Sequence, residues 1–149
     1  LVRYQRKISG PIVDRVDLWV EVPQVDHQKL SDDKIVSEPS ENIRKRVIKA
    51  REIQKKRFAA ENKAKKSKRK NEFETGVMTN SEMGVKELKK FAVLSEKVKD
   101  ILNSAAGKLD LSARAYHRVI KLSRTIADLD GAENIEENHI LEALQYRPK

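Results

Sequence analysis

The sequence contains no cysteine, and this absence excludes several kinds of chemistry. Without thiols the chain forms no disulfide, builds no thiolate metal site and carries no cysteine nucleophile. Histidine is scarce as well. His27, His117 and His139 stand far apart and show none of the paired spacing of a zinc site. We therefore expect no metal site built from the side chains of this chain.

Long apolar runs are also missing. No stretch approaches the roughly 20 apolar residues of a membrane-spanning helix, and the polar residues after Leu1 do not form a signal-peptide pattern. Hydrophobic residues make up 38% of the 149 residues and charged residues 37%, which predicts one modest core with some solvated segments. We expect a soluble, cytoplasmic protein without membrane contact.

The net charge of +9 is concentrated in one segment. Residues 44–70 hold fourteen lysines and arginines against two glutamates, a local excess of +12, so the remainder of the chain carries −3. Such a segment favours nucleic acid or another polyanion, although a lysine-rich loop that only aids solubility fits equally well. No aromatic residue interrupts residues 59–70, which weakens the case for nucleic-acid contact there. The candidate contacts are Lys63, Lys65, Lys66, Lys68, Arg69 and Lys70.

Val16, Leu18, Val20 and Val22 alternate with Asp17, Trp19 and Glu21, which predicts a β-strand that Pro23 ends. A strand needs partners to satisfy its backbone and to bury one face, and no second convincing strand follows it. The chain also begins with leucine rather than methionine. We therefore expect the partner strands to lie upstream, in a longer protein of which this sequence is a part.

The remainder of the chain is predicted to be helical. After a polar connector, a first helix runs to about Phe58, with Ile43, Val47, Ala50 and Phe58 on one face. The apolar pattern fails over residues 59–80, where we expect a flexible excursion.

Three further signals divide the C-terminal half into helices. Ser81 and Ser95 are candidate N-caps of two short helices, and Gly107 is the expected end of the second. A helix over residues 111–129 and a last helix after Asp130 complete the pattern. The expected fold is mainly α, a bundle of about five helices.

The helix over residues 111–129 carries most of the functional information. Arg114 lies in its first turn, where the helix dipole disfavours a cation by roughly 0.3–1 kcal/mol unless an anion is near. Exposed backbone N–H groups at the same end bind anions, so Arg114 is a candidate anion contact. An ion pair with Asp110 is the alternative. A polar stripe of the helix is expected to consist of Arg114, Arg118, Lys121, Thr125 and Asp128.

Two long strings resemble a known family. ISGPIVDRVDLWVEVP at residues 8–23 and LSARAYHRVIKLSRTIADL at residues 111–129, with the closing HILEALQYR, resemble the C-terminal part of magnesium-chelatase-related AAA+ ATPases, in particular the ComM (YifB-like) competence family. The resemblance covers both ends of the chain. It implies that residues 1–25, with the single strand, end the α/β nucleotide-binding core. Residues 26–38 would be a linker, and residues 39–149 a helical lid domain with a basic flexible excursion near residues 59–80.

The resemblance also implies roles for three arginines. Arg15 matches the arginine finger that reaches the ATP site of a neighbouring subunit, and a salt bridge with Asp14 or Asp17 is the alternative. Arg114 matches the sensor-2 arginine, which touches the γ-phosphate within its own subunit. Arg118, one turn further, either assists Arg114 or lies on the solvated stripe.

For the whole protein, the resemblance implies ATP hydrolysis with Mg²⁺ in a ring of identical subunits, expected to be a hexamer. The ring would act as a DNA helicase or branch-migration motor during natural transformation. The chain contains no Walker A or Walker B motif, so alone it is expected neither to bind nor to hydrolyse ATP. Three alternatives remain: a basic helical nucleic-acid-binding module without an ATPase role, a magnesium chelatase motor subunit, and a structural helical adaptor.

Overall fold

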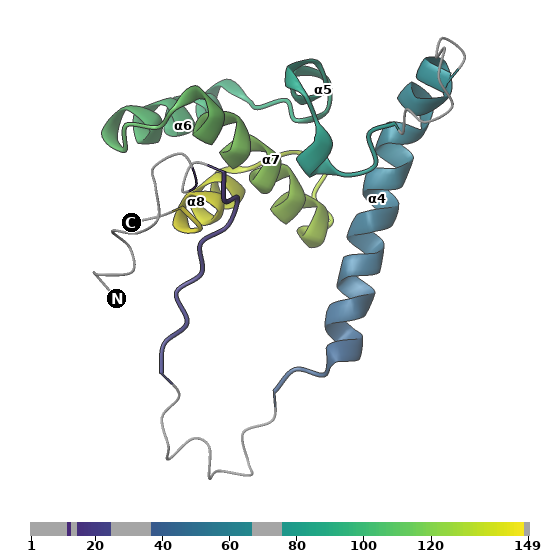
Figure 1. Ribbon diagram of the computed structural model, residues 1–149, viewed down its shortest axis with the longest axis horizontal. Helices are drawn as coiled ribbons and strands as arrows, with labels where there is room; N and C mark the ends of the chain where they lie inside the picture. The colour runs from purple at the N-terminus through teal and green to yellow at the C-terminus, as the bar shows by residue number, and fades with distance from the viewer. Residues whose placement is uncertain (1–11, 13–14, 25–36, 67–75, 148–149) are drawn as a thin grey trace.

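The computed structural model describes residues 12, 15–24, 37–66 and 76–147, except for the side chains of residues 64–66. This part of the chain is mainly helical, as predicted, and contains five α-helices and one short 3-10 helix (Figure 1). The elements are α4 (Ser40–Lys66), η1 (Asn80–Glu82), α5 (Val85–Phe91), α6 (Glu96–Lys108), α7 (Ala113–Asp130) and α8 (Glu137–Gln145). The central helix is α7, which contacts α4, η1, α5 and α8.

The predicted strand is absent from the described residues. Residues 16–24 run without strand hydrogen bonding, and Val20 and Val22 are exposed. The Trp19 amide instead donates to the carbonyl of Tyr146, 2.8 Å away, at the end of α8. The alternating pattern is real, but a strand requires a neighbouring strand, and no other strand lies in the described part of the chain.

Helix α4 is longer than predicted and packs along only part of its length. It continues to Lys66 instead of ending near Phe58, so residues 59–66 are helical where a flexible excursion was expected. Alanine, glutamate and lysine dominate that stretch, and their high helix propensity sustains a helix without an apolar face. Ile43 and Val47, placed on the apolar face of this helix from the sequence, are 44% and 45% exposed. The N-terminal part of α4 projects beyond the other helices (Figure 1).

Two predicted helix boundaries are wrong for local reasons. Ser81 lies inside η1, and α5 begins instead after Gly84, whose amide donates to the carboxylate of Glu87 at 3.0 Å. Gly107 lies inside α6. The left-handed residue after α6 is Asp110, with φ of 47°, and the Leu111 amide donates to the carbonyl of Ala106. This is the Schellman arrangement, with aspartate in the place where glycine is usual.

The core lies between α7 and the helices around it. Leu102, Ala127 and Ile140 are fully buried, and Phe58 of α4 packs edge-to-face on Phe91 with ring centroids 5.3 Å apart. An aromatic pair of this geometry contributes about 0.5–1.5 kcal/mol beyond its buried area. Phe58 therefore fastens the middle of α4 to the bundle.

Helix α8 begins with an unusual cap. Nδ1 of the buried His139 accepts a hydrogen bond from the Glu136 amide, and its Nε2 lies 3.0 Å from the Asp130 carboxylate. The imidazole thereby joins the end of α7 to the start of α8. Among the helices of the described residues, none is long and apolar enough to cross a membrane.

Candidate nucleotide-facing site

A serine cap forms the N-terminus of α7, at the start of the helix predicted over residues 111–129. The Ser112 hydroxyl accepts a hydrogen bond from the Ala115 amide at 3.1 Å, and Arg114 is the second residue of the helix. A serine cap of this kind contributes about 1 kcal/mol and fixes where the first turn begins. The cap therefore sets the position of Arg114 on the surface of the bundle.

A pocket beside this end of α7 brings together residues far apart in sequence. Its polar lining contains Arg15, Arg114, His117, Arg118 and Lys121. Met83, Leu88 and Leu122 supply apolar surface, and among the described residues of the lining Asp17 is the only acidic one. Several cations beside a helix N-terminus favour an anion, and guanidinium groups suit phosphate oxygens in particular. The two arginines singled out from the sequence, Arg15 and Arg114, thus line the same pocket.

Arg118 also lines the pocket, and its guanidinium bonds to the N-terminal segment. Its Nη1 donates to the carbonyl of Val16, and its Nε lies 3.7 Å from the carboxylate of Asp17. Asp17, offered as a salt-bridge partner for Arg15, is therefore near Arg118. These contacts connect α7 to the segment that carries Arg15.

Lys121 is a pocket residue whose role the sequence did not suggest. Its ammonium group donates to the Ser81 carbonyl at 2.9 Å, so it holds η1 against α7. It lies seven residues after Arg114, two turns along the same helix face. The seven-residue spacing in the sequence could have indicated that Lys121 lies on the same helix face as Arg114.

A buried charge cluster lies at the other end of α7, and the sequence prediction missed it. Asp128 is 1% exposed instead of lying on a solvated stripe. Its Oδ2 accepts from Nη1 of Arg57 at 2.7 Å and from the Asn80 amide at 2.8 Å, while its Oδ1 accepts from Nε of Arg124 at 3.0 Å. Nη2 of Arg57 pairs with the same carboxylate. One carboxylate thus joins α4, η1 and α7.

Arg124 is the second buried cation of this cluster. Besides Asp128, it donates to the carbonyl oxygens of Ala132 and Glu133, at 2.7 and 2.8 Å. Burial lowers the pKa of the Arg124 guanidinium from its ordinary value, and the neighbouring Asp128 opposes that shift. The group stays charged because an arginine pKa lies far above neutral pH. The cluster is therefore a desolvated set of two cations and one anion with additional hydrogen bonds.

Only some of the basic residues proposed as nucleic-acid contacts lie in the described part of the chain. Lys63 is exposed on α4, and Lys65 and Lys66 lie in the last turn of that helix, with side chains outside the described set. Lys68, Arg69 and Lys70 lie outside the described residues. Further exposed cations on α4 are Arg44, Lys45, Arg46, Lys49, Arg51, Lys55 and Lys56. Arg57, counted in the same basic segment, instead pairs with Asp128.

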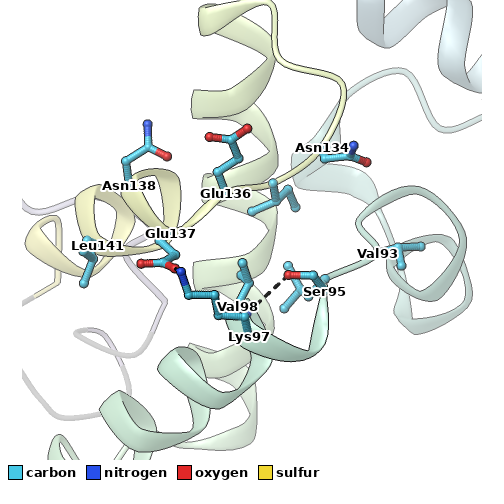
Figure 2. A pocket seen from close by; sticks show the side chains of 11 residues that line it. Val93, Ser95, Lys97, Val98, Asn134, Glu136, Glu137, Asn138 and Leu141 are labelled. Carbon is cyan, nitrogen blue, oxygen red and sulfur yellow. Dashed lines mark hydrogen bonds and ion pairs between the residues drawn. The ribbon is translucent and has the colours of Figure 1, made fainter.

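A second pocket lies where the segments before α6 and α8 run side by side (Figure 2). Leu94 and Ile135 form a single parallel β-bridge there, and the exposed side chains of Val93 and Leu141 lie at the pocket. Lys97 pairs with Glu137, and this hydrogen bond raises the pKa of the lysine. The described residues show no cluster of three or more potential metal ligands.

Comparison with known proteins gives one consistent family. Residues 37–147 match the family model described as magnesium chelatase, subunit ChlI C-terminal, and residues 1–30 match the model described as magnesium chelatase, subunit ChlI. Competence protein ComM of Haemophilus influenzae is 37% identical over 147 residues, which cover 99% of this chain and 25% of that protein. The YifB proteins of Salmonella typhimurium and Escherichia coli are each 34% identical over 146 residues, or 98% of this chain and 25% of theirs. The chain thus spans about a quarter of the length of these curated relatives.

Proposed function

Because this chain belongs to the magnesium chelatase ChlI C-terminal family, we propose that it is the lid region of an AAA+ ATPase that works as a ring-shaped motor. In the full-length protein, ATP and Mg²⁺ would be held by the upstream core, and the lid would contribute arginines to sites shared between subunits. The similarity to a competence protein supports DNA as the substrate, handled during recombination or branch migration in DNA uptake.

The pocket at the start of α7 is the observation that carries this proposal. Arg114 lies beside a serine-capped helix N-terminus, and the pocket also contains His117 and Lys121. This arrangement suits a terminal phosphate, whose charge satisfies both the guanidinium and the helix dipole. In our proposal Arg114 is the sensor-2 arginine. Its different contacts with ATP and ADP would move the lid against the core during turnover.

Arg15 is proposed as the arginine finger for the adjacent subunit. It is exposed and lies next to the segment bound by Arg118, at the rim of the lid rather than in its core. An arginine finger stabilises charge on the transferred phosphoryl group and raises the rate by about 10³–10⁵ in well-studied NTPases. The lid would thus serve two ATP sites, its own and its neighbour's.

The test of Arg114 compares two substitutions in the full-length protein. Arg114→Ala should lower ATPase turnover, whereas Arg51→Gln, on the exposed face of α4, should leave turnover without DNA unchanged. Both variants should retain helix content, because neither residue contributes to the buried core. Normal ATPase kinetics in Arg114→Ala would refute the sensor assignment.

The test of Arg15 uses mixed rings. Subunits with Arg15→Ala are titrated into wild-type subunits, and ATPase activity is measured against the fraction of variant. A finger acting on a neighbour makes activity fall in a way that depends on ring composition. Activity that is simply the sum of the two homogeneous populations would exclude action in trans.

The exposed cations of α4 favour a second candidate function, nucleic-acid binding by the helical module itself. Such binding would depend little on sequence and would weaken steeply with salt, because each phosphate contact releases a counterion. The test is a salt titration of this chain against single- and double-stranded DNA, with Lys55→Gln/Lys56→Gln as the variant. Absence of binding at low salt would remove this candidate. A flat salt dependence would contradict the phosphate contacts.

A further inference from the structure

Arg118 lies one turn beyond Arg114 on α7, yet it bonds to the segment that carries Arg15. Its Nη1 donates to the Val16 carbonyl, and its Nε is 3.7 Å from the Asp17 carboxylate. The Asp17 side chain is 73% exposed, so its ion pair with Arg118 is partly solvated. The Arg118 side chain is 15% exposed, so its hydrogen bond to the Val16 carbonyl is largely shielded from water. A hydrogen bond from a charged donor in such a place is stronger than an exposed one.

A second contact fixes the same segment three residues later. The Trp19 amide donates to the Tyr146 carbonyl at 2.8 Å, and the indole Nε1 is buried, with no hydrogen-bond partner among the described residues. Residues 16–19 lack strand hydrogen bonds, so contacts with the helices hold them. The contact of Arg118 comes from α7, the helix that carries Arg114.

We propose that Arg118 is a positioning residue for Arg15, which makes the location of the arginine finger depend on the helix that carries the sensor arginine. This inference rests on the proposed function. When Arg114 contacts the γ-phosphate in its own subunit, any shift of α7 is passed through Arg118 to Val16 and Asp17. Arg15, the adjacent residue, then moves relative to the neighbouring ATP site. One side chain would thus couple the two sites.

The anchoring can be measured without nucleotide, because Trp19 is the only tryptophan of the 149-residue chain. In this chain, Arg118→Gln should lower the docking equilibrium of the segment by about tenfold, the loss expected for one charge-assisted hydrogen bond. Tryptophan emission should then shift to longer wavelength, and quenching by acrylamide should increase. Arg118→Lys should restore part of the change, and Arg51→Gln should cause none.

A charge reversal at Asp17, outside the helices, tests the same anchoring if Arg118→Gln fails to fold. Asp17 is 73% exposed, so Asp17→Arg leaves α7 intact and places a cation opposite Arg118. It should produce the same shift in tryptophan emission at unchanged helix content. Unchanged emission in both Asp17→Arg and folded Arg118→Gln would overturn the anchoring.

The catalytic consequence is tested by a double-substitution cycle in the full-length ring. Arg118→Gln should lower kcat by about tenfold with little change in KM for ATP, because the finger acts in the transition state. Adding Arg118→Gln to Arg15→Ala should cause no further loss, whereas independent, multiplying losses would overturn the inference. Normal kcat in Arg118→Gln with reduced kcat in Arg15→Ala would overturn positioning and leave the finger intact. Normal kcat in Arg15→Ala would refute the finger assignment and this inference with it.

Discussion

Replacing Asp128 by alanine should cost more stability than any other single charge removal in the described structure. The carboxylate is 1% exposed and accepts hydrogen bonds from Arg57, Asn80 and Arg124. Its removal leaves the buried guanidinium of Arg124 and the largely buried one of Arg57 without their counter-charge. Breaking a buried ion pair from one side typically costs about 3–5 kcal/mol, because an uncompensated charge remains in a low dielectric.

That loss is a large share of the 5–15 kcal/mol that stabilises a typical domain. For the roughly 110 residues that the structure describes, it corresponds to a fall in Tm of roughly 10–20 °C. Arg57→Ala should cost less, about 1.5–3 kcal/mol, because Asp128 keeps Arg124 and Asn80 as partners. A larger loss of unfolding free energy in Asp128→Ala than in Arg57→Ala is therefore as much a part of the prediction as the two magnitudes.

Urea unfolding followed by circular dichroism measures both variants, with Asp100→Ala as the control for an exposed aspartate. The control should change the free energy of unfolding by no more than about 0.5 kcal/mol. The slope m should stay constant across the set if the native state remains compact. Equal losses for Asp128→Ala and Asp100→Ala would show that the buried cluster contributes nothing to stability.

Three further predictions concern local structure. Gly131→Ala should destabilise the protein by about 1–2 kcal/mol, because φ of 72° is strained for alanine. Gly107→Ala, inside α6, should instead stabilise it by about 0.5–1 kcal/mol. Thermal unfolding measures both changes, and a change of the same sign in the two variants would contradict the assigned backbone conformations. Ser112→Ala should remove about 1 kcal/mol by deleting the cap of α7, and restoration by Ser112→Asp in the same unfolding assay would identify capping as the cause. Leu102→Ala should cost about 2–5 kcal/mol in urea unfolding, since the side chain is fully buried, and a loss below 1 kcal/mol would mean that its site is not part of the core.

Features set by neighbouring residues were predictable from the sequence. The N-cap Ser95 was predicted from the sequence, and Ser112 and the left-handed Gly131 occupy positions that local capping chemistry explains. Gly107 was assigned the wrong role because glycine is the usual left-handed residue, while the structure uses Asp110. The prediction of a strand over residues 16–22 was wrong for another reason. Alternation is local, but strand formation depends on a partner strand.

Long-range electrostatics marks the limit of the sequence prediction. A helical wheel places Asp128 on the charged side of α7, and charged side chains are rarely buried. Its partner Arg57 is 71 residues away, so nothing in the local sequence indicates the pair. Within the site, the family resemblance supplied Arg15, whereas the place of Arg114 in the first turn of its helix already made it a candidate anion contact. Their meeting at one pocket with Lys121, and the bond from Arg118 to Val16, required the three-dimensional arrangement.

Helix α4 packs against the bundle over only part of its length, so a tilt of the packed part moves its exposed end. Its buried face runs from Ala50 through Gln54 to Phe58, and Arg57 adds an ion pair with Asp128, while residues 40–49 are exposed. At 1.5 Å per residue, Ser40 lies about 15 Å from Ala50 along the helix axis. A tilt of about ten degrees about Ala50 would move Ser40 by about 2.6 Å. Repacking of the buried face of α4 would therefore displace the exposed, positively charged end of the helix.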